Sequence, residues 1–343
     1  MTFQIKNIKK TTFWFYFLKY ILIPIYNFMW EYFFNIQGKI LYICFRFSNK
    51  VQNYKEFFIK NNDKKILRSN QELKNLCNEI SSRLNDNFLK EMEKKLESKT
   101  YPDDHYLKNK KGYVIDMFPY LEKDLRIKII DFATNSMNIS IVADYLKVLP
   151  RISKINLNLN IPVGGSVERG PMLWHKDDFG FKSLDLFAPI GEVGDENGPF
   201  HYVEKKNDLG VFFKLTDIKK DSFKGERNKI DLNIFEKLNE DTKKFVGNSG
   251  DLIFIDSFRC YHRGGFCKTK KRIMLRVAYQ TLDSTNIIGR ENNFSDIKEK
   301  NKLNIFLKFI LFKYPKFYEK IKLQSFLLKI YRLFHFKKKL SIH

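Results

Sequence analysis

Residues 151–165 read RISKINLNLNIPVGG, and this stretch decides the fold class. Apolar and polar residues alternate through it with a period of two. The alternating residues are Ile155, Leu157, Leu159 and Ile161 on one side and Asn156, Asn158 and Asn160 on the other. Such alternation is typical of a β-strand that buries one face. The stretch therefore predicts a strand with one face on a hydrophobic core.

The chain on either side of this strand has different character. Further strands are predicted at 183–190, 200–203, 252–256 and 272–281, with turn signals GDENGP and GNSGD between them. Before the strand, apolar residues recur at three- and four-residue steps over 71–96, which predicts one amphipathic helix, and a second helical region covers about 120–146. We expect a mainly β domain with helical flanks, an α+β fold, over residues 71–290.

Both ends of the chain are basic and aromatic. The formal net charge is +23, and residues 1–50 carry seven Lys/Arg against one acid while residues 302–340 carry eleven against one. The uncharged run 20–30 is too short to span the hydrocarbon core, which needs about 20 residues. Two interpretations of the segments 1–70 and 291–343 stay open: helices in a membrane interface with lysines toward anionic headgroups, or helices packed on the domain.

The four cysteines have no paired short spacing, which favours a reducing, cytoplasmic location over a disulfide framework. Cys260 and Cys267 flank a histidine, but no fourth partner is near, so we interpret them as strand and turn residues rather than as ligands of a zinc ion.

Two short motifs carry candidate metal ligands, WHKDD at 174–178 and YHRGG at 261–265. Asp177 lies two residues after His175, so both side chains project from the same side of an extended segment. With His262 from a distant strand they form two imidazoles and one carboxylate, the ligand set of non-haem Fe(II) oxygenases. The alternative is a turn-capping Asp177 and a polar strand end at His262, and His201 is the nearest competing ligand.

A candidate anion-binding residue follows on the next strand. Arg272 opens the predicted strand 272–281, and a guanidinium holds a carboxylate of a dicarboxylate co-substrate through two hydrogen bonds. The alternative is a solvated charge on an edge strand. Arg276 shares the same face and competes for this role. Around the metal motif, Trp174, Phe179 and Phe181 are expected to form an apolar wall.

Three stretches together resemble a known family. WHKDDFGFKSLDLFAPIGEVGDENGPFHYV, GDLIFIDSFRCYHRGG and RIMLRVAY are similar in order and spacing to the phytanoyl-CoA dioxygenase family of 2-oxoglutarate-dependent oxygenases, over about 156–280. The resemblance implies a double-stranded β-helix, a jelly-roll or cupin-like core. It also implies Fe(II) on His175, Asp177 and His262, and 2-oxoglutarate on Arg272, with molecular oxygen as the other co-substrate.

The function expected from the sequence is hydroxylation of a small-molecule or lipid-like substrate, with the basic ends in peripheral contact with a membrane. Nucleic acid is not expected as a partner, because residues 51–301 retain only +7 of the charge. The alternatives are a nucleic-acid dealkylase of the same chemistry and a non-enzymatic, membrane-associated jelly-roll protein. Substrate identity and oligomeric state have no signal in the sequence.

Overall fold

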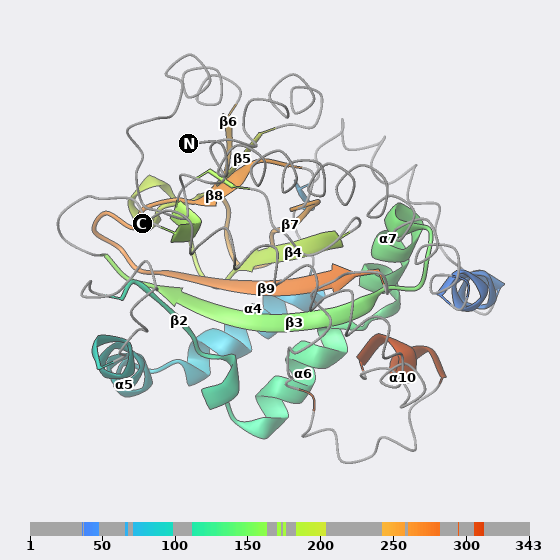
Figure 1. The fold of residues 1–343 in the computed structure, drawn as a ribbon. Coiled ribbons are helices and arrows are strands. Elements are labelled where there is room, and N and C mark those ends of the chain that lie inside the picture. Colours follow the sequence, from blue (N-terminus) through green and yellow to red (C-terminus); the bar gives the residue numbers. More distant parts are fainter. Residues whose placement is uncertain are drawn as a thin grey trace, which may run out of the picture.

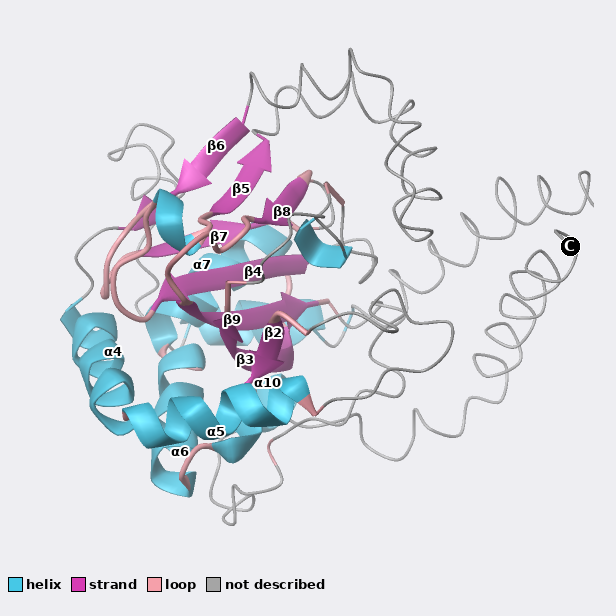
Figure 2. Cartoon of the chain, turned by 90° about the vertical axis from the view of Figure 1, so that its left-hand side faces the viewer, coloured by secondary structure: helices cyan, strands magenta, loops and turns pink. Residues whose placement is uncertain are grey.

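The computed structural model stacks helices, a six-stranded sheet and a three-stranded sheet in that order (Figure 2). It describes residues 36, 38–47, 66–67, 71–98, 112–162, 170–172, 174–175, 183–203, 242–257, 260–281, 294 and 305–311, with the backbone alone at 66–67. Helices together with antiparallel sheets confirm the expected α+β class.

The larger sheet is built around two long strands. The alternating stretch forms β3 (Arg151–Asn160), which pairs antiparallel with β9 (Arg272–Gln280). The remaining strands are β4 (Ser183–Pro189), β7 (Leu252–Ile255), β2 (Val114–Asp116) and β1 (Ile66–Leu67), in the order β1-β7-β4-β9-β3-β2. Because β9 lies between β4 and β3 (Figure 1), it is a central strand, and the interpretation of its first arginine as an edge-strand charge is wrong.

The smaller sheet has the order β6-β5-β8 and is also antiparallel. Its strands are β6 (Thr242–Phe245), β5 (Phe200–Val203) and β8 (His262–Gly264). The predicted strands at 183–190, 200–203, 252–256 and 272–281 are confirmed as β4, β5, β7 and β9. Strands β1, β2, β6 and β8 have two to four residues each, too few for a period to show in the sequence.

Two asparagines divide the predicted helices. The single helix expected over 71–96 is wrong, because the side chain of Asn85 accepts a hydrogen bond from the Phe88 amide (2.9 Å) and starts a new helix. Asn135 does the same for the region 120–146 through the Asn138 amide (2.8 Å). The helical elements are α4 (Gln71–Arg83), α5 (Asp86–Glu97), η2 (Phe118–Tyr120), α6 (Lys123–Ala133), α7 (Ser136–Leu146), η3 (Gly170–Met172), η4 (Asp195–Asn197) and α10 (Ile305–Leu311).

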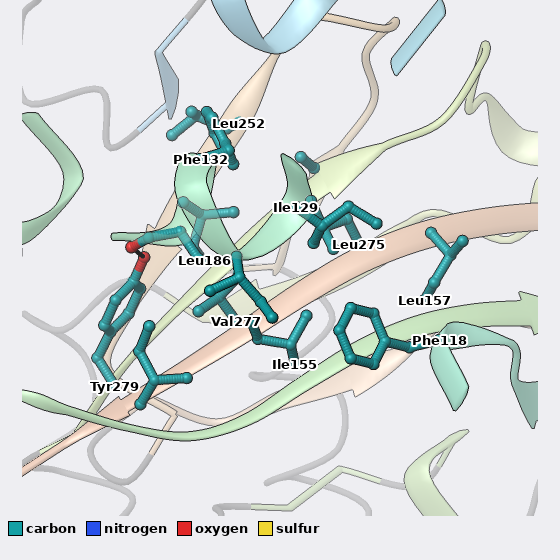
Figure 3. Packing of buried hydrophobic residues seen from close by; sticks show 14 of the residues in the cluster. Phe118, Ile129, Phe132, Ile155, Leu157, Leu186, Leu252, Leu275, Val277 and Tyr279 are labelled. Atoms are coloured by element: carbon teal, nitrogen blue, oxygen red, sulfur yellow. Dashed lines mark hydrogen bonds between the residues drawn. The ribbon is translucent and has the colours of Figure 1, made fainter. Parts of the chain in front are cut away.

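The main core lies between the larger sheet and the helices. Figure 3 shows residues of β3, β4 and β9, among them Leu157, Leu186 and Val277, packed beside Ile129 of α6. Tyr279 at the far end of β9 is fully buried, and its hydroxyl donates to the Ala133 carbonyl (2.6 Å). This packing holds the long strands in a fixed position against the helical layer.

A second apolar cluster joins the two sheets on their facing sides. It consists of Phe187, Val193, Phe200, Tyr202, Phe245, Ile253, Ile255 and Met274. Strand β9 therefore contributes Leu275, Val277 and Tyr279 to the helical side and Met274 to the inter-sheet side. The polar neighbours of Met274 on that face, Arg272 and Arg276, consequently lie between the sheets.

The described parts of the two ends pack on the domain. In the helix over 38–47 (blue in Figure 1), Leu41, Tyr42 and Phe45 are buried, and the Gly38 carbonyl accepts from the Leu149 amide (3.0 Å). Phe45 also contacts Phe306 of α10 edge to face, with ring centroids 5.6 Å apart. The predicted run 20–30 lies outside the described residues. Among the described helices, none is both long and apolar enough to cross a bilayer.

Candidate metal centre

Backbone pairing brings two of the three predicted metal ligands together. His175 and His262 form an isolated antiparallel bridge in which each amide donates to the other residue's carbonyl, both at 3.0 Å. Residues directly opposite in such a pair point to the same face. Their ring centroids are 4.3 Å apart, at an interplanar angle of 55°.

This spacing fits a shared metal ion. Two imidazoles that each bind one ion through a nitrogen at about 2.1 Å place their ring centres roughly 4 to 5 Å apart when the angle at the metal is near 90°. The third predicted ligand, Asp177, lies outside the described residues, as do Phe179 and Phe181. Within the part of the chain that the structure describes, no group of three metal-binding side chains is present.

The surroundings of His262 fix its orientation. Its ring is buried, and Nδ1 lies 3.1 Å from the Cys260 carbonyl oxygen. A hydrogen on Nδ1 donates to that carbonyl and places the lone pair on Nε2, as in histidines that bind metal ions. Phe200 of β5 stacks on the ring, with centroids 5.5 Å apart and planes 27° apart. This phenyl ring shields one side of the imidazole from water.

Arg272 is a buried cation without a carboxylate partner among the described residues. Its Nε and Nη1 atoms are buried and make no hydrogen bond there, and burial lowers the pKa of the guanidinium. A Cβ atom at Gly264 would lie 3.4 Å from Nη2, so the guanidinium of Arg272 lies beside β8 at this position. Gly264 follows His262 by two residues, so both occupy the same face of β8. Arg272 and His262 thus face one space.

The competing arginine has a carboxylate partner. Arg276 Nη2 donates to Asp185 Oδ2 at 2.7 Å, and Asp185 is only 1% exposed. The Arg276 guanidinium also lies 5.6 Å from the centre of the Phe187 ring, which in turn stacks on Phe200 at 4.6 Å. The sequence offered no sign of the role of Asp185, because a carboxylate in the middle of a hydrophobic strand becomes informative only when its partner is known.

The asparagine face of β3 also turns toward this space. Asn160 pairs with Arg272 and Asn156 with Arg276 in the strand register, so their side chains share the inner face. Both asparagines are buried, and Asn156 donates to Asp116 (2.5 Å), whose pKa is raised mainly by burial. The expectation of one buried face on β3 is therefore wrong: both faces are covered, and the inner one is polar.

The competing histidine, His201, lies on the other face of the smaller sheet. Its neighbours Phe200 and Tyr202 belong to the inter-sheet cluster, and His201 pairs in register with Arg263. Trp174 lies beside it, edge to face at 6.4 Å, and the Arg263 guanidinium lies 4.9 Å from the centre of the indole ring. Trp174 therefore contacts His201 and Arg263 rather than lining the metal motif, and Phe200 forms the apolar wall of His262.

Protonation of His201 should weaken the fold in acid. Burial, with the charges of Arg263 and Lys244, lowers the pKa of His201 to about 4, from 6.5. Between these values the unfolded chain binds a proton that the folded chain does not, so stability is complete above pH 6.5 and falls toward pH 4. Urea titrations at about pH 7 and about pH 4.5 give the unfolding free energy of each protein at both values. We expect this free energy to fall less for His201→Gln than for wild type. Equal losses would show that His201 protonates freely in the folded chain.

The flanking cysteines have structural partners. Cys267 is buried and its thiol donates to the Asn197 carbonyl (2.9 Å), while burial raises the pKa of this thiol. Cys260 is buried and supplies the carbonyl that orients His262. Neither cysteine lies in a strand: Cys260 is at a bend before β8, and Cys267 lies in the connection between β8 and β9.

Comparison with known proteins gives a limited likeness. No family model matches the sequence, and no curated protein matches it. Among solved structures, the chain is similar to HygX from Streptomyces hygroscopicus with nickel and 2-oxoglutarate bound (11% identity, 63% of this chain, 82% of that one, TM-score 0.37). It is also similar to the epimerase SnoN from nogalamycin biosynthesis (13% identity, 63% of this chain, 77% of that one, TM-score 0.39). A further similar structure is EctD from S. alaskensis with bound Fe (15% identity, 63% of this chain, 72% of that one, TM-score 0.39).

Proposed function

We propose that this chain is an Fe(II)- and 2-oxoglutarate-dependent oxygenase that hydroxylates a small-molecule substrate. The observation that carries the proposal is the pair His175 and His262, which face the same space as the buried guanidinium of Arg272, a cation with no carboxylate partner among the described residues. In this proposal Asp177 is the third iron ligand, and the two sheets are the halves of a double-stranded β-helix.

The separation of these groups selects the co-substrate. Gly264, against which the Arg272 guanidinium rests, is two residues from His262, or about 7 Å along the strand. One small carboxylate cannot bind both a metal at the histidines and the guanidinium. A dicarboxylate with several atoms between its ends can, which fits 2-oxoglutarate. The negative charge would also compensate a guanidinium whose burial is otherwise costly.

The residues around the histidines supply binding, orientation and water exclusion. The Cys260 carbonyl holds the His262 tautomer, Phe200 covers the ring, and Arg272 binds the distal carboxylate. When bound, iron and 2-oxoglutarate would supply the oxidation, in which 2-oxoglutarate and O₂ would give succinate and CO₂, with one oxygen atom of O₂ in succinate and the other in a C–H bond of the substrate.

Anaerobic addition of Fe(II) followed by 2-oxoglutarate tests the proposal. We expect a visible charge-transfer absorption that needs both components and that bleaches when oxygen is admitted, with formation of succinate. A chain that binds neither component would instead be a non-enzymatic jelly-roll protein. A dealkylase would give the same absorption, but its oxygen consumption would respond to methylated nucleic acid rather than to small molecules.

A further inference from the structure

The helix over 38–47, together with the helical residue Ile36 before it, exposes an apolar face opposite the one that packs on the domain. Ile36, Ile40, Ile43 and Phe47 are 41%, 55%, 52% and 88% exposed. Their spacing of four, three and four residues places them in one row along the helix, which we call the outer stripe.

The outer stripe is unusual for this protein. Eight large hydrophobic residues are exposed in the described part of the chain, and four of them belong to the outer stripe. A fifth, Ile305, lies on α10, which packs against the helix over 38–47. Single exposed apolar residues are ordinary on a protein surface, whereas a contiguous group marks a site of interaction. The outer stripe therefore calls for a partner that covers apolar side chains.

The charge around the stripe indicates which partner. Lys39 and Arg46 are exposed on the same helix, and both helices fall within the basic ends, which together carry +16 of the net charge of +23. If a second copy of the chain covered the outer stripe, the basic residues of the two copies would repel each other. Nucleic acid would pair with the basic residues but would leave the apolar side chains of the stripe exposed to water. An anionic lipid surface matches both features, because apolar side chains enter the interface while cations contact headgroups.

We propose that the outer stripe docks this chain on an anionic bilayer, with the helix over 38–47 lying in the plane of the interface. Its other face stays on the domain, where Tyr42 donates to Asp144 (3.1 Å) and Leu41 and Phe45 join the core. The helix is thus a fixed part of the body, and docking would orient the whole domain on the lipid surface. The inference does not depend on the proposed iron chemistry.

Sedimentation of the full-length protein with vesicles tests this assignment. We expect binding to mixed phosphatidylcholine and phosphatidylglycerol vesicles, little to phosphatidylcholine alone, and weaker binding in high salt. The double variant Ile40→Asn/Ile43→Asn should bind about 100-fold more weakly, since each buried isoleucine contributes roughly a factor of ten. The matched control Tyr120→Asn/Val246→Asn removes two equally exposed apolar residues elsewhere and should bind like wild type. Thermal unfolding would verify that both variants fold.

Cys44 provides a second readout on the same helix. It is exposed, while Cys77, Cys260 and Cys267 are buried, so a polarity-sensitive fluorophore on the folded protein reports from this face. We expect its emission to shift to the blue on anionic vesicles. Undiminished vesicle binding by the stripe variant would overturn the proposal, and so would sedimentation with vesicles without a blue shift of the emission. Either result would mean that the basic charges of the two chain ends bind the vesicles without the outer stripe. A wild-type dimer that ignores vesicles and becomes a monomer in the stripe variant would overturn it in favour of a second copy.

Discussion

Replacing Asp177 or His262 by alanine is expected to weaken ferrous-ion binding by at least about 10- to 100-fold and to abolish turnover, while His201→Ala leaves the affinity for Fe(II) close to wild type. Loss of a residue that merely orients a ligand typically costs 10 to 100-fold in metal affinity, so loss of a ligand should cost at least about that much. The His201 substitution should not change the Fe(II) affinity, because His201 lies on the face of β5 opposite to Phe200, whose ring covers His262.

The controls for this comparison follow from burial. His262 is 4% exposed, so an alanine there also leaves a cavity, and His262→Gln retains most of the volume and serves as the second variant. Anaerobic Fe(II) titration and succinate yield are the measurements. Wild-type iron binding in both Asp177→Ala and His262→Gln would mean that residues 175, 177 and 262 do not form one site, and the oxygenase proposal would fail with them.

The two arginines of β9 should separate co-substrate binding from stability. Arg272→Leu is expected to raise the 2-oxoglutarate requirement by roughly 100-fold, or about 2.7 kcal/mol, because the distal carboxylate loses its guanidinium. The same change should leave stability in the absence of 2-oxoglutarate equal or higher, since it removes a buried charge that lacks a carboxylate partner among the described residues.

Arg276→Leu should show the reverse pattern. It leaves the buried Asp185 carboxylate without its guanidinium, which typically costs about 3 to 5 kcal/mol of unfolding free energy. Urea denaturation with and without 2-oxoglutarate measures both effects for both variants. If the co-substrate requirement rises in Arg276→Leu and not in Arg272→Leu, Arg276 is the anchor and the assignment is reversed.

The sequence predicted the long elements of the fold because their periods extend over many residues. The alternation in β3 and the apolar runs of β4, β7 and β9 gave strands that the structure confirms. The sequence did not identify Asn85 and Asn135 as N-cap residues of new helices. In the sequence, an asparagine on the polar face of one long helix cannot be distinguished from an asparagine that caps a second helix. The short strands β6 and β8 are defined by their pairing with β5, which no local sequence pattern shows.

The candidate site was predictable in its residue types and less so in its partners. His175 and His262 were paired on chemical grounds, and the backbone bridge between them follows from a register that no local pattern encodes. The choice between Arg272 and Arg276 stayed open because it depends on Asp185, 91 residues before Arg276 in the chain. Gly264 belongs to the YHRGG motif, but only the folded structure shows that it lies beside Arg272.

The bridge between His175 and His262 links iron supply to protein turnover if both residues bind the ion. It is an isolated bridge, so local opening there would break two hydrogen bonds and part the two imidazoles. A ligand that binds only the closed form lowers the population of the open form by a factor of one plus the ratio of free ligand concentration to Kd, so the effect grows with the concentration of free metal. If iron is bound there, its depletion would raise the open population, and cleavage of the chain at this bridge should be faster without the metal than with it.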